Sequence, residues 1–280
     1  MTKVKVGFQG ELGAFSQEAA RQLLGQDVRV VPYQKFEDVF RALERKEIGV
    51  AVIPMENTLA GSVHENYDHL LKYQFRMVGE TNVRIVHNLI APPGVTFKKL
   101  RRVFSHPVAL NQCHDFFGSN PQIEKIPFYD TAGSVKMVIA DKLPDAAGIA
   151  SQVAASIYGG KILKRSIEDD HRNFTRFCLL SARTFPIKFL VSSSNDWKTS
   201  LVFTTRNVPG ALFRCISAFA LRDISLAKIE SRPLRGKPWE YLFYVDLLGR
   251  EDDPRVQKAL GHLEELADFL RVLGSYPKGD

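Results

Sequence analysis

The alternation of short apolar runs with amphipathic stretches near the N-terminus constrains the fold of this chain more than any other feature. Residues 4–10, 28–33 and 49–55 are apolar runs of strand length. Between them, residues 13–25 and 35–49 place their apolar side chains at helical spacing. The order strand, helix, strand, helix, strand predicts a parallel sheet with crossover helices.

The same alternation returns after residue 78, so the sequence predicts a second, similar α/β lobe. It includes a helix at 131–143, and Thr131 suits the capping position at its N-terminus. In open α/β sheets, ligands bind beyond the carboxyl ends of the strands. Polar clusters that we expect at such ends would meet in a cleft between the lobes; they span 54–62, 104–107, 129–133 and 173–177.

The last 80 or so residues follow a different pattern. A serine-rich polar stretch at 191–198 predicts a linker. Beyond it we expect the order βαββαβ, with both helices on one face of an antiparallel sheet and a turn at 234–240. The first of these helices should open at Pro209 and face inward with Leu212, Phe213, Ile216 and Phe219.

Composition and motifs argue against several classes of function. The net charge is +7, but the basic residues are dispersed, so we expect no nucleic-acid partner. The chain has no apolar run of 18 residues and no secretion signal, which predicts no membrane association and a cytoplasmic location. Its three cysteines are widely spaced, which indicates neither a disulfide framework nor a zinc site. The glycines of 7–13 are not spaced as in a dinucleotide-binding loop.

The polar clusters contain hydroxyls, amides and one guanidinium, without a strong nucleophile–base pair or a metal-ligand set. Such groups suit an anion bound through many hydrogen bonds, with an arginine gripping a carboxylate. They also suit a reaction that needs positioning and charge stabilisation. The acidic run 168–170 is expected to be a solvated loop rather than an acid/base pair.

Almost end to end, the chain resembles the bacterial prephenate dehydratases. The stretches that carry the resemblance are 7–20 (GFQGELGAFSQEAA), 52–63 (VIPMENTLAGSV), 105–113 (SHPVALNQC), 173–177 (NFTRF), 209–213 (PGALF) and 229–233 (IESRP). The resemblance implies an α/β fold, with a two-lobed catalytic domain similar in build to periplasmic binding proteins over residues 1–185. Its lobes would span about 1–77 plus 175–185, and 78–174. A linker at 186–198 would lead to an α+β ACT regulatory domain over 199–280.

The resemblance implies a carbon–oxygen lyase of phenylalanine biosynthesis that converts prephenate to phenylpyruvate, water and carbon dioxide without a cofactor or metal. Loss of carbon dioxide leaves electrons that expel the ring hydroxyl as the ring becomes aromatic. Thr175 would be the catalytic residue, donating either a proton or a hydrogen bond to the departing oxygen. Arg176 would either hold a substrate carboxylate or orient its loop. The other substrate-binding residues would be Asn57, Thr58, Gly61, Ser62, Ser105, His106, Gln112, Thr131, Asn173 and Phe177.

In the tail, the resemblance implies an effector site for phenylalanine, enclosed by two stretches from adjoining subunits. It therefore implies a homodimer or a homotetramer. The effector-binding residues would be Pro209, Gly210, Ala211, Leu212, Glu230, Ser231, Arg232 and Pro233. The chain departs from the family at Glu11 and Leu12, which leaves the contacts of the first loop open, and at Gly133 and Ser134.

Other functions remain open at this point. Arogenate dehydratase is a close alternative, since it makes phenylalanine from the amino-bearing substrate, and nothing in the residues chooses between the two substrates. A non-catalytic receptor coupled to an amino-acid sensor would share the same architecture. A ligand-responsive DNA regulator is disfavoured, because no helix-turn-helix candidate lies beside the tail.

Overall fold

The computed structural model of the chain describes residues 4–182, 185–186, 190–191, 194–234, 236–237 and 239–279. The chain divides into two units, residues 1–73 with 81–179, and residues 74–80 with 180–280. None of the helices in the described part of the chain has the length and apolar character needed to cross a membrane.

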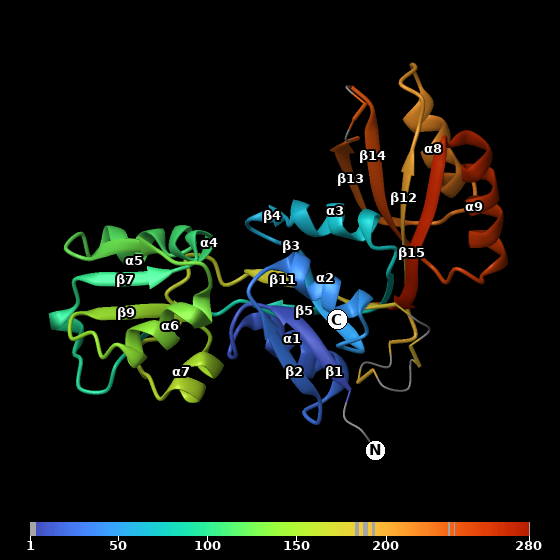
Figure 1. Ribbon diagram of the computed structural model, residues 1–280. Helices are drawn as coiled ribbons and strands as arrows, with labels where there is room; N and C mark the ends of the chain where they lie inside the picture. The colour runs from blue at the N-terminus through green and yellow to red at the C-terminus, as the bar shows by residue number, and fades with distance from the viewer. Residues whose placement is uncertain are drawn as a thin grey trace. The chain divides into compact units, whose positions relative to one another are not determined.

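The first sheet has the strand order β2-β1-β3-β11-β5, with the short β4 beside β3 (Figure 1). β1 pairs in parallel with β2 and with β3, as the alternation of strands and helices predicted. The second sheet begins at β6 rather than near residue 78, because β5 belongs to this first sheet. The elements of this lobe are β1 (Lys5–Gln9), α1 (Phe15–Leu24), β2 (Arg29–Tyr33), α2 (Phe36–Glu44), β3 (Val50–Asn57), β4 (Gly61–Ser62), α3 (His64–Lys72), β5 (Arg76–Arg84) and β11 (Phe174–Ser181).

The second sheet has the order β10-β6-β9-β7-β8 and is mixed. β7 is parallel to β8 and β9, whereas β6 is antiparallel to β9 and β10. The elements of this lobe are β6 (Asn88–Ala91), a 3-10 turn η1 (Phe97–Lys99), β7 (Arg102–Ser105), α4 (Pro107–Asn111), α5 (His114–Gly118), β8 (Glu124–Pro127), α6 (Thr131–Ala140), β9 (Ala146–Ala150), α7 (Gln152–Tyr158) and β10 (Lys161–Lys164).

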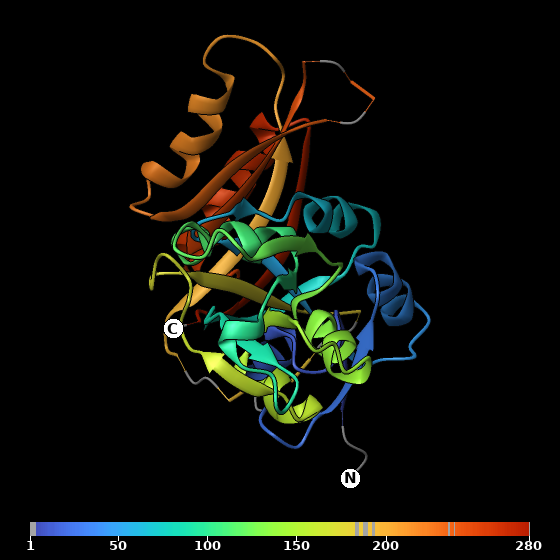
Figure 2. The same ribbon diagram turned by 90° about the vertical axis from the view of Figure 1, so that its left-hand side faces the viewer.

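The central strands β6 and β9 of the second sheet are buried on both faces because helices cover both (Figures 1 and 2). Successive residues of a strand point to opposite faces. Leu89 and Ile149 pack in a cluster with α4 and α5, and their neighbours Ile90 and Ala150 pack with α6 and α7. Phe8 of the first lobe belongs to the second of these clusters. One hydrophobic cluster therefore joins the two lobes.

The second unit contains an antiparallel sheet of order β13-β14-β12-β15, with α8 and α9 packed on it. Its elements follow the expected order βαββαβ and are β12 (Trp197–Thr204), α8 (Ala211–Ala220), β13 (Leu226–Pro233), β14 (Tyr241–Leu248), α9 (Pro254–Leu266) and β15 (Phe269–Pro277). The predicted fold class, a two-lobed α/β domain with an α+β βαββαβ domain, is confirmed.

Two predictions about helices were wrong. Phe213 does not face inward, since it is 76% exposed. The buried stripe of α8 passes through Cys215, Ala218 and Phe219, and Phe213 lies off that stripe. Thr131 does not cap α6, because the residue before it, Asp130, caps the helix by accepting a hydrogen bond from the backbone N–H of Gly133.

The linker and turn predictions fall partly outside the described residues. Within the expected linker 186–198, residues 187–189 and 192–193 lie outside them, and β12 begins at Trp197. Within the expected turn 234–240, Arg235 and Pro238 lie outside them.

Candidate active site

A pocket of about 430 Å³ opens in the first unit between the two lobes. It lies where β1, β3 and β7 end and where β11 begins. The start of β11 is beside the end of β3, because the backbone N–H of Thr58 donates to the carbonyl of Phe174. The residues that line the pocket are Gln9, Ala14, Phe15, Ser16, Phe36, Pro54, Asn57, Ala60, Gly61, Ser62, Val63, Ile85, His87, His106, Val108, Ala109, Gln112, Tyr129, Asp130, Thr131, Thr175 and Phe177.

The pocket brings together most of the residues that the sequence predicted to bind substrate. They come from four segments that are far apart in the chain, which is the arrangement expected of a cleft between lobes. The predicted residues that line it are Asn57, Gly61, Ser62, His106, Gln112, Thr131, Thr175 and Phe177.

Arg176 is not among the residues that line the pocket. Neighbouring residues of a strand point to opposite faces, so Thr175 and Phe177 face the pocket and Arg176 faces away from it. The Arg176 side chain is buried, and its Nη1 lies 3.2 Å from a carboxylate oxygen of Glu56. Of its two expected roles, binding of a substrate carboxylate does not fit this geometry, because the side chain faces away from the pocket and contacts Glu56. Orientation of the loop stays a prediction.

Thr58, Ser105 and Asn173 also lie outside the pocket lining, in supporting positions. The Ser105 hydroxyl donates to the carbonyl of Ile149, which ties β7 to β9. The Thr58 hydroxyl donates to the carbonyl of Arg172 and holds the loop before β11. Asn173 is fully buried and contacts two of the lining side chains.

Two backbone groups fix the orientation of the Asn57 amide. Its Oδ1 accepts hydrogen bonds from the N–H groups of Leu59 (3.0 Å) and Ala60 (2.8 Å). Its Nδ2 therefore lies on the other side and donates to Thr175 Oγ1 (3.0 Å) and Asn173 Oδ1 (2.7 Å). Because Thr175 Oγ1 accepts this bond, the hydroxyl hydrogen of Thr175 remains available to another acceptor.

The hydrogen bonds of Gln112 show which ring nitrogen of His87 carries the hydrogen. Gln112 donates through Nε2 to Asn57 Oδ1 (3.2 Å), and its Oε1 accepts from Asn173 Nδ2 (2.9 Å). His87 Nε2 lies 2.9 Å from that same Oε1, so Nε2 must carry the hydrogen. Burial lowers the pKa of His87, which favours the neutral ring.

The sequence analysis missed His87 and Asp130, both of which line the pocket. His87 and Asn88 are polar residues between the apolar pairs 85–86 and 89–90, and that break in the pattern is a signal that could have found His87. Asp130 directly precedes a helix, where an aspartate is a strong capping candidate. Burial raises the pKa of Asp130 to about 6.

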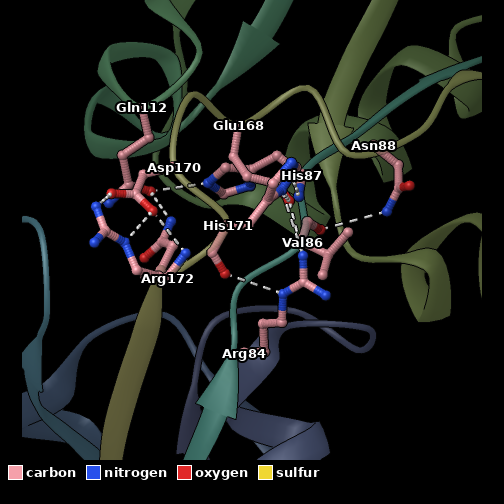
Figure 3. A network of polar contacts seen from close by, with 10 residues as sticks. Arg84, Val86, His87, Asn88, Gln112, Glu168, Asp170, His171 and Arg172 are labelled. Carbon is pink, nitrogen blue, oxygen red and sulfur yellow. Dashed lines mark hydrogen bonds and ion pairs between the residues drawn. The ribbon is translucent and has the colours of Figure 1, made fainter.

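The acidic run 168–170 is not simply a solvated loop (Figure 3). The Glu168 side chain is buried, accepts from the backbone N–H of His87, and lies 3.8 Å from Arg84 and 3.5 Å from His171. Asp169 accepts from the backbone N–H groups at the start of α5. These contacts hold the loop that leads into β11 and therefore help to position Thr175.

Helix N-termini supply the field that favours anions in this pocket. α1 and α6 each begin at a residue that lines it, and Val63, which lines it, directly precedes α3. A helix N-terminus carries partial positive charge, which stabilises carboxylates nearby. Among the described residues, no group of three or more histidine, cysteine, aspartate or glutamate side chains could hold a metal ion.

The predicted effector residues lie in the second unit on two elements. Gly210 caps α8 with a left-handed backbone (φ +77°), and an added Cβ there would meet open space. Pro209 and Gly210 are exposed, whereas Ala211 and Leu212 are partly buried. Residues 230–233 lie on β13, an edge strand of its sheet, and alternate between partly buried and exposed.

The family model described as prephenate dehydratase matches residues 6–184, more than half of the chain. The chain belongs to the prephenate dehydratase family. The ACT domain model matches residues 199–265, within the βαββαβ unit. The family consists of carbon–oxygen lyases, so the chain is an enzyme of that class.

The proteins similar to this chain are named for different activities. Arogenate dehydratase/prephenate dehydratase 2, chloroplastic, from Arabidopsis thaliana is 44% identical, over 99% of this chain and 73% of its own length. The structure of a prephenate dehydratase from Arthrobacter aurescens in complex with L-Phe is 30% identical with a TM-score of 0.88, covering 98% of this chain and 90% of that one. GqqA, described as a novel type of quorum quenching acylase, is 30% identical with a TM-score of 0.86, covering 98% of this chain and 97% of that one. These relatives include a plant enzyme, so the similarity is to the family as a whole and not to its bacterial members in particular. Their names also differ in the substrate.

Proposed function

We propose that this enzyme catalyses the decarboxylating dehydration of a cyclohexadienol dicarboxylate in phenylalanine biosynthesis. Prephenate is the substrate expected from the sequence, and phenylpyruvate is then the product. Arogenate, which bears an ammonium group where prephenate has a carbonyl, is the second candidate. The name of the Arabidopsis thaliana relative, which includes both activities, favours keeping both.

The single observation that carries this proposal is the hydrogen bond that Asn57 Nδ2 donates to Thr175 Oγ1. The substrate's ring carboxylate leaves as carbon dioxide, its bonding electrons enter the ring, and the C4–oxygen bond breaks with its electron pair on oxygen. That oxygen leaves as hydroxide, stabilised by a hydrogen bond from Thr175, and takes a proton from solvent to become water. Asn57 Nδ2 donates to Thr175 Oγ1, so the Thr175 hydrogen is free to point at the departing oxygen.

Asn57 also strengthens Thr175 as a donor. Negative charge that develops on Thr175 Oγ1 during the reaction is stabilised by the hydrogen bond from Asn57, 3.0 Å away. An alcohol alone is a weak acid, so a donated hydrogen bond fits this site better than complete proton transfer from Thr175.

Helix N-termini and neutral donors, rather than Arg176, would bind the substrate carboxylates. Gly61 and Ser62 precede α3, and Thr131 opens α6, so the backbone around these residues presents N–H groups and partial positive charge. Phe177 and Phe15 would form apolar walls for the ring.

Replacing Thr175 by valine tests this proposal, because valine keeps the shape and removes the hydroxyl. We expect kcat to fall by about 100- to 1,000-fold on either substrate, as when one donor to a developing anion is lost. Ser156→Ala is the matched control, since it removes an exposed hydroxyl on α7 outside the pocket lining. Wild-type protein that turns over neither substrate above the uncatalysed rate would contradict the proposed function.

For the ACT domain, we propose that phenylalanine is the effector and binds through residues 209–212 and 230–233 in a homodimer or homotetramer. The structure of the Arthrobacter aurescens relative in complex with L-Phe supports this choice of effector. Phenylalanine would change activity only by binding the active and inactive states with different affinity. Melting temperature and rate that both stay unchanged in millimolar phenylalanine would contradict the proposal.

A further inference from the structure

The charge inventory of the pocket is unusual for a site that binds a dianion. Among the described residues that line it, Asp130 is the only carboxylate, and there is no lysine or arginine. A carboxylate repels other carboxylates and carbonyl oxygens, whereas it attracts an ammonium group. Asp130 is therefore the group in this lining whose charge best distinguishes the two candidate substrates.

The local structure holds Asp130 in place but leaves it able to accept more hydrogen bonds. Its Oδ1 accepts from the backbone N–H of Gly133 (2.6 Å) and more weakly from that of Glu11 (3.4 Å), and the backbone N–H of Thr131 also stabilises the carboxylate. Among the described residues, no side chain donates a hydrogen bond to this carboxylate. A carboxylate can accept about four hydrogen bonds, so capacity remains for a ligand.

We propose that Asp130 determines substrate preference by binding the ammonium group of arogenate, where prephenate presents only a carbonyl oxygen. This proposal rests on the proposed function, because both substrates share the reacting ring, both carboxylates and the departing hydroxyl. Thr175 lies on β11 of the first lobe and Asp130 caps α6 of the second, so the two residues reach the pocket from different lobes. The departing hydroxyl of the substrate would contact the first lobe, and its ammonium group would contact the second.

Other titratable groups surround Asp130 and set when it is charged. Glu11 receives hydrogen bonds from Tyr129 Oη and Lys136 Nζ, each at 2.9 Å, and its charge adds to burial in raising the pKa of Asp130. The pKa values of Tyr129 and Tyr158 are raised, mainly by burial, so both phenols stay neutral near pH 7. Asp130 is thus charged at pH 8 and becomes neutral as the pH falls through about 6.

The test compares kcat/KM for arogenate and prephenate in wild type and Asp130→Asn at pH 8. Asparagine caps helices as well as aspartate does, so this variant removes the charge and keeps α6 capped. We expect wild type to prefer arogenate. In Asp130→Asn, kcat/KM for arogenate should fall by about 10- to 100-fold, the value of one charge-assisted hydrogen bond, with prephenate changing less than about threefold.

Glu11→Gln is the matched control, because it removes a carboxylate next to Asp130 that is not part of the pocket lining. Its substrate ratio at pH 8 should stay within about twofold of wild type. An equal loss on both substrates in Asp130→Asn, or an equal change of ratio in Glu11→Gln, would overturn the proposal. A wild type that prefers prephenate would contradict this inference. If Thr175→Val then loses both activities, the proposed function still holds.

A second measurement uses the wild-type enzyme and follows its substrate preference with pH. The wild-type ratio of kcat/KM, arogenate over prephenate and corrected for uncatalysed decay, should fall by about fourfold from pH 8 to pH 5.5. At pH 5.5, roughly three quarters of Asp130 would be protonated. His87 and His106 also line the pocket and have lowered pKa values, so Asp130→Asn serves to subtract their contribution. A ratio that does not change with pH in wild type would refute the role of Asp130.

Discussion

The direction of hydrogen bonds around Asn57 leads to a sharp prediction. Asn57 Nδ2 donates to Thr175 Oγ1 (3.0 Å), Asn173 Oδ1 (2.7 Å) and the carbonyl of Phe174 (3.0 Å). In Asn57→Asp an oxygen replaces this donor. The Thr175 hydroxyl can then turn and donate to the new carboxylate, which withdraws it from the substrate. Asn173 Oδ1, which is buried, loses its donor.

We expect Asn57→Asp to lower the free energy of unfolding by about 2 kcal/mol, the typical cost of one buried acceptor left unpaired. Its kcat should fall by about 100- to 1,000-fold, because the departing oxygen loses its hydrogen-bond donor. Urea denaturation measures the first effect, and turnover at saturating substrate measures the second.

Asn57→Ala separates two effects of Asn57→Asp: loss of the donor to Thr175 Oγ1, and gain of an acceptor for the Thr175 hydroxyl. Alanine also removes the donor, but it offers no acceptor to the Thr175 hydroxyl, which stays available to the substrate. The kcat of Asn57→Ala should therefore exceed that of Asn57→Asp by about tenfold, the effect of one modest hydrogen bond. If the aspartate variant is as fast as the alanine variant or faster, the donor direction deduced from Leu59 and Ala60 is wrong.

Three further predictions concern stability. Native Asp130 binds protons more tightly than the unfolded chain, because its pKa is raised to about 6, so the free energy of unfolding should fall as the pH rises. Relative to Asp130→Asn, wild type should lose about 1 kcal/mol between pH 5 and pH 8 in urea titrations, and an unchanged difference would contradict a buried carboxylate. Gly13→Ala should cost about 2 kcal/mol or more, because Gly13 has φ +89° and its added Cβ would lie 2.6 Å from the Cα of Ala154. Arg176→Met should cost about 1 to 2 kcal/mol, because it removes a charged partner of the partly exposed Glu56 carboxylate, while KM changes less than about threefold. A large rise in KM with unchanged stability would instead support substrate binding by Arg176.

Strand and helix order could be predicted because each element buries its own apolar side chains at a local period. The runs 4–10 and 49–55 and the helices between them predicted the parallel start of the first sheet, and the tail predicted βαββαβ. The place of β5 in the first sheet was not predicted, because pairing between strands far apart in sequence leaves no local pattern. For β11, only the family resemblance indicated the first lobe, by assigning residues 175–185 to it.

Of the candidate site, the sequence supplied most of the polar residues that line the pocket, since they cluster beside strand and helix ends. It left two roles open for Arg176, and the structure places this side chain beside Glu56 and outside the pocket lining. Asp130 and His87 were not predicted, because each resembles an ordinary structural residue in the sequence. Asp130 resembles a helix cap, and His87 resembles a polar residue next to a strand.

The sequence by itself determined the element order, the fold class and the family, because local periodicity and ordered motifs suffice for those. The tertiary structure alone decided which side chains face the pocket, which atoms donate and accept, and where the one carboxylate lies. Those properties depend on distances between segments more than 50 residues apart, such as Asn57 with Gln112 and Thr175. Burial then sets the protonation of Asp130, and burial exists only once the lobes have folded together.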